Sequence, residues 1–202
     1  MDDDSGVSDA AGSVPPMSAT APIDPLRMSA EELLELPDDG MRHELVEGEL
    51  RTMTPAGAEH GRVALSLGAR ILAHVEEHGL GEAYAPETGF VLTRGPDTVR
   101  APDVAFVSAE RLTGEPTPGF AELAPDLVVE VVPPWDRASE VSSKAAMWLD
   151  AGVRLVWVVD PQARLAAVHH PGGLVTVLRE DGVLDGEEVL PGFRLPLAVL
   201  LR

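Results

Sequence analysis

Apolar residues recur at helical spacing between Ala58 and His78. They return every three or four positions, which is the period of an amphipathic helix with one buried face. Gly79 follows directly, and glycine is a common residue just beyond a helix end. A second predicted helix covers residues 138–151 and is closed by Gly152. The apolar positions of the first helix are Val63, Leu67, Ala69, Ile71, Leu72 and Val75.

Two local signals further toward the N-terminus predict a short helix and a hairpin. Ser29, with Glu32 three residues later, has the pattern of a capping box, so we expect a helix that starts there and ends before Pro37. The segment His43–Met53 carries two apolar runs separated by Glu47-Gly48, which predicts a β-hairpin with its turn at those two residues.

The remaining chain alternates short apolar runs with turn residues, which indicates strands. One predicted strand, Arg154–Val159, is continuously apolar after its first residue, as is typical of a strand buried on both faces. Strands interspersed with two long helices predict an α/β or α+β fold, with a central mixed sheet and a helix on each face. The other predicted strands are Glu82–Tyr84, Gly89–Thr93, Val104–Val107, Leu127–Val132, Ala166–His169 and Val175–Leu178.

The first 27 residues differ in composition from the rest. They hold five aspartates and a single arginine among Ser, Ala, Gly and Pro. Such a segment has too little apolar surface to offset the entropy of folding, so we expect a disordered acidic leader over residues 1–27. Residues 28–202 then form one domain, since 45% of the chain is apolar and can supply a core.

Charge and composition exclude several classes of function. Fifteen Lys and Arg stand against 34 Asp and Glu, giving a formal net charge of −19, which excludes a protein that coats nucleic acid non-specifically. The chain has no cysteine, which excludes disulfides, zinc-thiolate sites and thiol catalysis. No apolar run reaches the about 18 residues of a membrane span, and the N-terminus lacks a secretory signal. We therefore expect a cytoplasmic protein without a membrane partner.

Two carboxylates stand in apolar surroundings. Asp103 opens the predicted strand Val104–Val107, and Glu130 lies inside the otherwise apolar run Leu127–Val132. Burying an unpaired carboxylate is costly, and a bound divalent cation or a nearby ammonium would offset that cost. Carboxylate oxygens are the ligands that Mg²⁺ prefers. The alternatives are that Asp103 only starts its strand and that Glu130 forms a structural ion pair.

Lys144 is the one lysine among the basic residues, the others being arginine. It falls fourteen residues after Glu130, on the predicted helix that follows this strand. A helix that returns along the sheet could bring its ammonium to the strand carboxylate, although a lysine exposed to solvent is the alternative. His60, at the start of the first long helix, could contact a phosphate or act as a base, whereas capping or packing is the commoner role of such a histidine.

Five blocks of the sequence together resemble one protein family. They are Arg42–Leu50, Glu59–Gly61, Ala101–Val107, Pro125–Val132, and Lys144 followed by Ala151–Pro161. Their order and spacing are similar to those of the Uma2 family of restriction-endonuclease-like proteins. The resemblance extends from about Met28 to the C-terminus and leaves only the leader outside.

This resemblance implies the PD-(D/E)xK nuclease fold, a mixed β-sheet flanked by helices. Asp103 and Glu130 correspond to the acidic pair of that pattern. The lysine of the wider superfamily follows the second acid by two positions, where this chain has Val132; in the Uma2-type arrangement it lies on the following helix, which matches Lys144. Glu44 matches an acidic residue of the first block, so the expected catalytic residues are Glu44, Asp103, Glu130 and Lys144.

The function implied is that of a Mg²⁺- or Mn²⁺-dependent endonuclease that hydrolyses DNA, with metal ligands Asp103, Glu130 and the carbonyl of Val131. The turn after Glu130 departs from the family, because Pro133-Pro134-Trp135-Asp136 replaces a hydroxyl-containing turn. A non-catalytic binding or assembly module with the nuclease fold is therefore the alternative. Two-carboxylate glycoside chemistry ranks last, since aromatic residues are only 4% of the chain. The fold also allows a homodimer, and the arginines expected to line a DNA groove are Arg42, Arg51, Arg62, Arg94, Arg100 and Arg137.

Overall fold

The structure, a computed structural model, describes residues 27–112, 118–134 and 138–202. Its centre is a six-stranded mixed sheet with the strand order β10-β9-β8-β7-β6-β3. Only the β7–β8 pair is parallel, because the long helix between these two strands carries the chain back to the same edge. The strands are β3 (Gly81–Tyr84), β6 (Val104–Ser108), β7 (Leu127–Val131), β8 (Leu155–Asp160), β9 (Leu165–His169) and β10 (Val175–Leu178).

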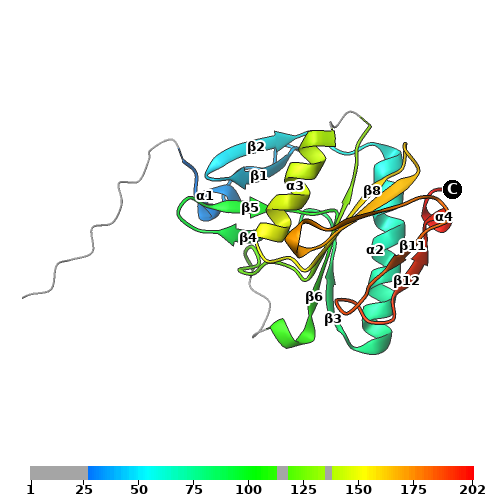
Figure 1. The fold of residues 1–202 in the computed structure, drawn as a ribbon. Coiled ribbons are helices and arrows are strands. Elements are labelled where there is room, and N and C mark those ends of the chain that lie inside the picture. The colour runs from blue at the N-terminus through cyan, green and yellow to red at the C-terminus, as the bar shows by residue number, and fades with distance from the viewer. Residues whose placement is uncertain (1–26, 113–117, 135–137) are drawn as a thin grey trace, which may run out of the picture.

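Helices α2 (Ala58–His78) and α3 (Ala138–Asp150) cover the two faces of this sheet (Figure 1). On the α2 face, Leu67 and Ile71 pack in the same cluster as Trp157 of β8. On the α3 face, Ala145 and Trp148 pack against Val128 and Val156. The structure thus confirms the predicted mixed sheet with a helix on each face. None of the helices among the described residues is both long and apolar enough to cross a bilayer.

A second, four-stranded sheet has the order β2-β1-β5-β4. It confirms the predicted hairpin: β1 and β2 pair antiparallel, and the turn residues Glu47 and Gly48 both have positive φ, as a two-residue hairpin turn of type I′ requires. The short helix α1 (Ala30–Leu34) has the capping box expected at Ser29 and Glu32. The strands are β1 (Arg42–Val46), β2 (Glu49–Met53), β4 (Phe90–Thr93) and β5 (Thr98–Arg100).

Four short elements were not predicted from the sequence. They are β5, β11 (Val183–Asp185), β12 (Arg194–Pro196) and α4 (Leu197–Leu200). Each has only three or four residues, too few to show a hydrophobic period. The β11–β12 hairpin and α4 lie beside α2 in Figure 1 and add Leu184, Leu195 and Leu200 to its side of the core. Two 3₁₀ turns, η1 (Ala109–Arg111) and η2 (Pro171–Gly173), complete the described elements.

The buried face of α2 differs in part from the predicted one. Ala69 and Leu72 are exposed, with 43% of Leu72 accessible, so both assignments to the core were wrong. Their place is taken by Ala64 and by His60, which is 9% exposed and continues the buried stripe into the first turn. The helix therefore carries a histidine into the interior at its N-terminal end.

The predicted leader lies outside the described residues, apart from Arg27. The guanidinium of Arg27 donates a hydrogen bond to the carbonyl of Glu47 (2.8 Å) at the β1–β2 turn. The backbone of Met28 then donates to the carbonyl of Gly48 (2.9 Å), so the described chain begins against this hairpin.

Candidate active site

Asp103 and Glu130 come together because β6 and β7 are antiparallel neighbours. Val104 at the start of β6 faces Val129 near the end of β7, and the backbone of Asp103 donates to the carbonyl of Val129 (3.1 Å). Asp103, just before β6, and Glu130, near the end of β7, therefore lie close together where these two strands meet at one end of the sheet. The first turn of α2 reaches the same end.

Asp103 is 3% exposed and holds three partners. Its Oδ2 accepts a hydrogen bond from the backbone N–H of Val131 (2.7 Å) and lies 3.1 Å from Nε2 of His60. Its Oδ1 lies 3.7 Å from the guanidinium of Arg42. Burial raises the pKa of Asp103, but the contact with His60, the Val131 N–H and the charge of Lys144 together outweigh it and lower the pKa, so this carboxylate is ionised.

Glu130 points toward α3. The alternation of side chains along β7 puts it on the same face as Val128, which packs against that helix. Lys144 Nζ donates to Glu130 Oε2 (2.6 Å), and Trp148 Nε1 donates to Oε1 (2.7 Å). These two donors stand one helical turn apart, so one face of α3 serves both oxygens.

The pKa of Glu130 is raised. Burial is the main cause, and the negative charge of Asp103 adds to it, while the charge of Lys144 and the two hydrogen bonds act in the opposite direction. Two neighbouring carboxylates with pKa values moved in opposite directions are a common feature of functional sites, because a site built for a cation gathers negative charge.

Glu44 is buried just behind this pair. Its Oε1 accepts from the backbone N–H of Ala101 (2.9 Å), and its Oε2 lies 3.2 Å from Nε of Arg100. Both partners belong to the short segment that leads into Asp103. Glu44 therefore fixes the backbone that positions Asp103, and it also lines the clefts described next.

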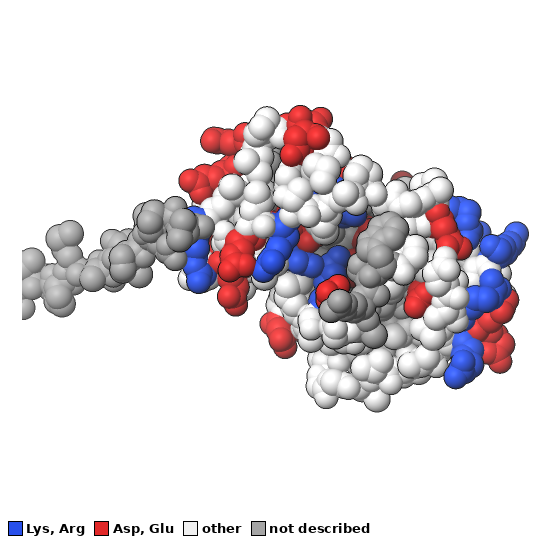
Figure 2. All heavy atoms as spheres, turned by 90° about the horizontal axis from the view of Figure 1, so that it is seen from above, with Lys and Arg blue, Asp and Glu red and all other residues white. Residues whose placement is uncertain are grey.

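Two clefts open onto the carboxylates. The larger, of about 810 Å³, contains Asp103, Glu130, Val131 and Lys144 in its lining, and the smaller has a volume of about 500 Å³. Arg42, Glu44, Ala56, His60 and Asp103 line both, so Asp103 stands where the clefts meet. In Figure 2, which views the molecule from above, several basic side chains lie near the middle of the face, separate acidic patches lie toward the top and left, and a mixed group of basic and acidic side chains lies at the right edge.

The arginines expected around the groove separate into three groups. Arg42, Arg51 and Arg100 line the larger cleft. Arg62 and Arg94 line neither cleft, and a role for them in binding DNA stays a prediction. Arg62 donates to the carbonyl of Leu200 in α4 (3.1 Å), and Arg94 is held by a group of acids. These acids are Glu31, Asp97 and Glu122. Arg137 lies outside the described residues, as do Trp135 and Asp136 of the departing turn.

The donor set suits a magnesium-type ion better than zinc. Among the described residues, no group of three or more His, Asp or Glu side chains is placed to hold one metal ion. Mg²⁺ needs only one or two carboxylates, because it retains water and takes oxygens from a phosphate. The described side chains offer two: the Oδ1 of Asp103, which faces only Arg42 at 3.7 Å, and the carboxylate of Glu130. These residues therefore fit Mg²⁺ or Mn²⁺.

The predicted site residues are thus close in space, and two further residues join them. Trp148 was not among the predicted site residues, yet its indole N–H donates a hydrogen bond to Glu130 Oε1 (2.7 Å). Its position four residues after Lys144 was the available signal, since such residues share a helix face. His60 was considered a weaker candidate, and it contacts Asp103 directly.

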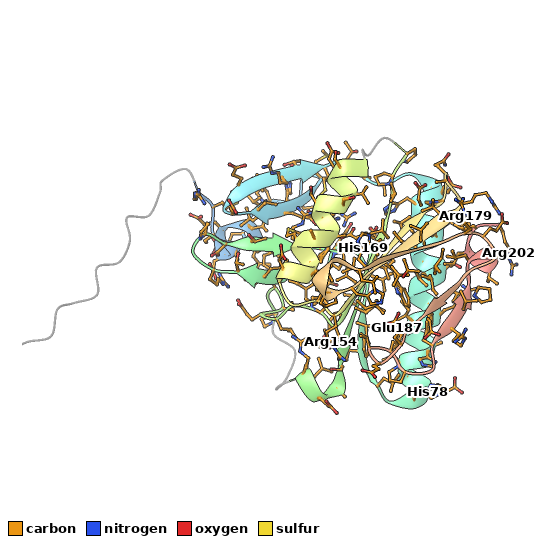
Figure 3. The ribbon with its side chains drawn as sticks, viewed as in Figure 1. His78, Arg154, His169, Arg179, Glu187 and Arg202 are labelled. Atoms are coloured by element: carbon orange, nitrogen blue, oxygen red, sulfur yellow. The ribbon has the colours of Figure 1, made fainter. Side chains whose placement is uncertain are left out.

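A further buried carboxylate, Asp126, lies at the opposite end of β7. Its Oδ1 is 3.1 Å from Arg111 and 3.5 Å from Arg154, and its Oδ2 accepts from the backbone N–H of Ser108 (2.9 Å). Arg154 appears in Figure 3 near η1, far from the start of α2. Neither cleft reaches Asp126, so this cluster holds strand ends together rather than forming part of the candidate site.

Comparison with known proteins gives a matching family and similar solved structures, one of which is described here. The model of the family described as "Uma2: Putative restriction endonuclease" matches residues 30–198. A structure described as that of a putative nuclease belonging to DUF820, from Anabaena variabilis ATCC 29413, is similar over 86% of this chain and 97% of that one. The TM-score is 0.73 and the sequence identity is 20%, so this likeness concerns the fold. No curated protein matches the chain.

Proposed function

The chain belongs to the Uma2 family of putative restriction endonucleases, and from this premise we propose that it is a Mg²⁺- or Mn²⁺-dependent endonuclease that hydrolyses phosphodiester bonds of DNA. One observation carries the proposal. Asp103, directly before β6, and Glu130, on the neighbouring strand β7, both line the larger cleft, and the ammonium of Lys144 lies 2.6 Å from Glu130. Two carboxylates and a lysine at an open site are suited to phosphoryl chemistry, which depends on charge stabilisation.

Asp103, Glu130 and the carbonyl of Val131 would hold the metal ion. When bound, the ion would neutralise charge on the scissile phosphate and make a water molecule more acidic. Groups of the protein would position these ligands and bind the substrate. Val131 supports this arrangement through its N–H, which donates to Asp103 Oδ2 (2.7 Å) and leaves Oδ1 with the more distant guanidinium of Arg42 (3.7 Å).

Lys144 would act through its positive charge. Its side chain is 27% exposed and lines the larger cleft, so the ammonium can remain near Glu130 while it faces a phosphate in that cleft. It would there orient the attacking water or stabilise the charge that develops on the phosphate. Arg42 lines both clefts and would contact the neighbouring part of the backbone. Glu44, expected to be a catalytic acid, has contacts that favour a positioning role.

A second candidate function is a non-catalytic module that retains the nuclease fold. The hydrogen bonds of Glu130 favour this function, because both of its carboxylate oxygens already accept one, from Lys144 and from Trp148. In such a protein the Glu130–Lys144 contact would be a structural ion pair. The two functions differ in their response to metal.

The test is a cleavage assay with plasmid and oligonucleotide DNA in Mg²⁺ and Mn²⁺ at low salt. Glu130→Gln and Lys144→Ala should both abolish cleavage if the proposal is right. Glu76→Gln is the matched control, since Glu76 is an exposed residue of α2 that lines neither cleft. Cleavage that persists in Glu130→Gln, or that needs no metal, would contradict the proposed site.

Pairing of two copies also stays a prediction. The strand β10 is at the edge of the six-stranded sheet, and it exposes 46% of Val175 and 57% of Val177. An uncharged edge strand of this kind is the surface through which a homodimer would form. Sedimentation of the wild type and of Val177→Lys would test it, since a lysine on the edge strand should leave only the monomer.

A further inference from the structure

The two clefts that meet at Asp103 differ in their chemistry. The larger one is lined by four cations, namely Arg42, Arg51, Arg100 and Lys144. In the smaller one Arg42 is the one Lys or Arg side chain among the described lining residues. A phosphate backbone would therefore be held in the larger cleft and not in the smaller.

The smaller cleft has an apolar wall. Met41 and Leu65 line it and are 37% and 74% exposed, and Pro55 and Pro86 add further apolar surface. These side chains line the same cleft, where a bound ligand could cover them. A flat apolar ring could cover them, because every nucleobase has an apolar face that packs well against such a wall.

An acceptor stands at the same cleft. Glu87 lines it, is exposed, and has no hydrogen-bond or ion-pair partner among the described residues. Its carboxylate can accept hydrogen bonds from the exocyclic amino group of cytosine, in the way that Glu and Asp read this base. The cleft thus has an apolar surface and a hydrogen-bond acceptor for a base, but among its described lining residues only one lysine or arginine, Arg42, for a phosphate.

A base inside a duplex cannot reach this cleft without leaving its stack. Extruding it costs a few kcal/mol, and the cost is least for an unpaired base.

We propose that the smaller cleft is a base-binding subsite and that the substrate is an unpaired strand of nucleic acid. One base would lie against Met41 and Leu65 while the adjoining phosphate lies at Asp103. This inference deepens the proposed nuclease function and rests on it for the place of the scissile bond. The base subsite itself can be tested without cleavage.

The test uses oligonucleotides that carry one 2-aminopurine, as a single strand or as a blunt duplex of the same sequence, in EDTA at low salt. The fluorescence of 2-aminopurine rises when it leaves its neighbours, so binding of the single strand should raise it. Leu65→Gln should weaken binding about fivefold or more, since the base loses apolar contact. Leu72→Gln is the matched control, because it changes another exposed leucine of α2 that lines neither cleft.

Equal affinity for single strand and duplex, an unchanged affinity in Leu65→Gln, or no binding of the single strand would each overturn the inference. Thermal unfolding of both variants checks that they fold. Cleavage in Mn²⁺ separates the two proposals. Faster cleavage of the duplex would overturn the unpaired-strand substrate and leave the nuclease function intact. Base-dependent binding without any cleavage would support the subsite and contradict the nuclease function.

Discussion

Lys144 Nζ lies 2.6 Å from Glu130 Oε2, although fourteen residues separate the two in sequence. The contact arises because Glu130 faces α3 from β7, and Lys144 lies on the side of α3 that packs against that face. If Glu130 holds a metal ion, as proposed above, the ion and the ammonium of Lys144 would compete for this carboxylate. The competition would make the role of each residue measurable.

Mn²⁺ should stabilise the wild-type protein against unfolding. A ligand that binds only the folded state at 100 times its dissociation constant adds about 2.7 kcal/mol to the unfolding free energy. In Glu130→Gln the gain should vanish, because an amide is a poor ligand for this ion. Thermal unfolding with and without Mn²⁺ measures the effect. An equal rise of Tm in both proteins would place the metal elsewhere and favour the structural ion pair.

Removing the lysine should separate binding from catalysis. In Lys144→Met the carboxylate of Glu130 loses its competing cation, so Mn²⁺ should bind up to about tenfold more tightly, equivalent to about 1.4 kcal/mol. Cleavage should fall by about 10²–10³, because the charge that faces the phosphate is gone. Titration of Mn²⁺ by electron paramagnetic resonance, beside a single-turnover assay, checks both. Weaker metal binding in this variant would show that Lys144 supports the ion.

The indole of Trp148 should contribute through its N–H. Trp148→Phe keeps most of the packing in the α3 cluster but removes the donor to Glu130 Oε1, and a hydrogen bond to a charged group contributes about 1.5–3 kcal/mol. Trp157→Phe is the matched control. Trp157 is equally buried, and its Nε1 has no hydrogen-bond partner among the described residues.

Urea denaturation of the two tryptophan variants measures this difference. Trp148→Phe should lower the free energy of unfolding more than Trp157→Phe does. Because both substitutions remove a similar volume, the difference between the two losses measures the hydrogen bond to Glu130. Equal costs would mean that the contact with Glu130 adds nothing to stability. The Mn²⁺ response of Trp148→Phe should also be weaker than that of the control, since the carboxylate is then less well held.

The sequence singled out the carboxylates that meet at the candidate site, but it gave little indication of the cleft around them. Asp103 and Glu130 stand out locally, because each carboxylate interrupts or opens an apolar run, and the helix signals of α2 gave its bounds correctly. The arginines had no such signal. Arg94 is held by Glu31 and Glu122, which are distant in sequence, and only the folded chain brings them together.

The missed elements have a similar physical reason. The strand β5 has three residues and is defined by its pairing with β1 and β4, not by a pattern of its own. On α2, Leu72 belongs to an apolar pattern by type but faces solvent, because the helix has more apolar residues than its contact face can cover. Which leucine of the helix is buried cannot be predicted from residue type alone.

Asp126 should make stability depend on pH through the cluster at the other end of β7. Burial raises its pKa, but the N–H of Ser108 and the charge of Arg111 outweigh that effect and lower the pKa below its ordinary value. A carboxyl whose pKa is lower in the folded state stabilises the protein above its unfolded pKa of about 3.9, and this stabilisation is lost as the pH falls through the folded value.

Asp126→Asn should therefore be destabilised by about 1–2 kcal/mol at neutral pH, a range reduced because Arg111 and Arg154 are partly exposed and screened. The amide oxygen can still accept from Ser108, so the loss is chiefly that of the charge. Urea denaturation at a series of pH values should show the gap between the variant and the wild type narrowing below about pH 4, where the carboxyl of the unfolded chain becomes protonated, and closing once the pH falls below the lowered pKa of the folded state. Asp181→Asn, at an exposed turn, should show no comparable gap at neutral pH. A gap for Asp126→Asn that stays constant into acid would mean that packing of the carboxyl group, and not its charge, holds this end of the sheet.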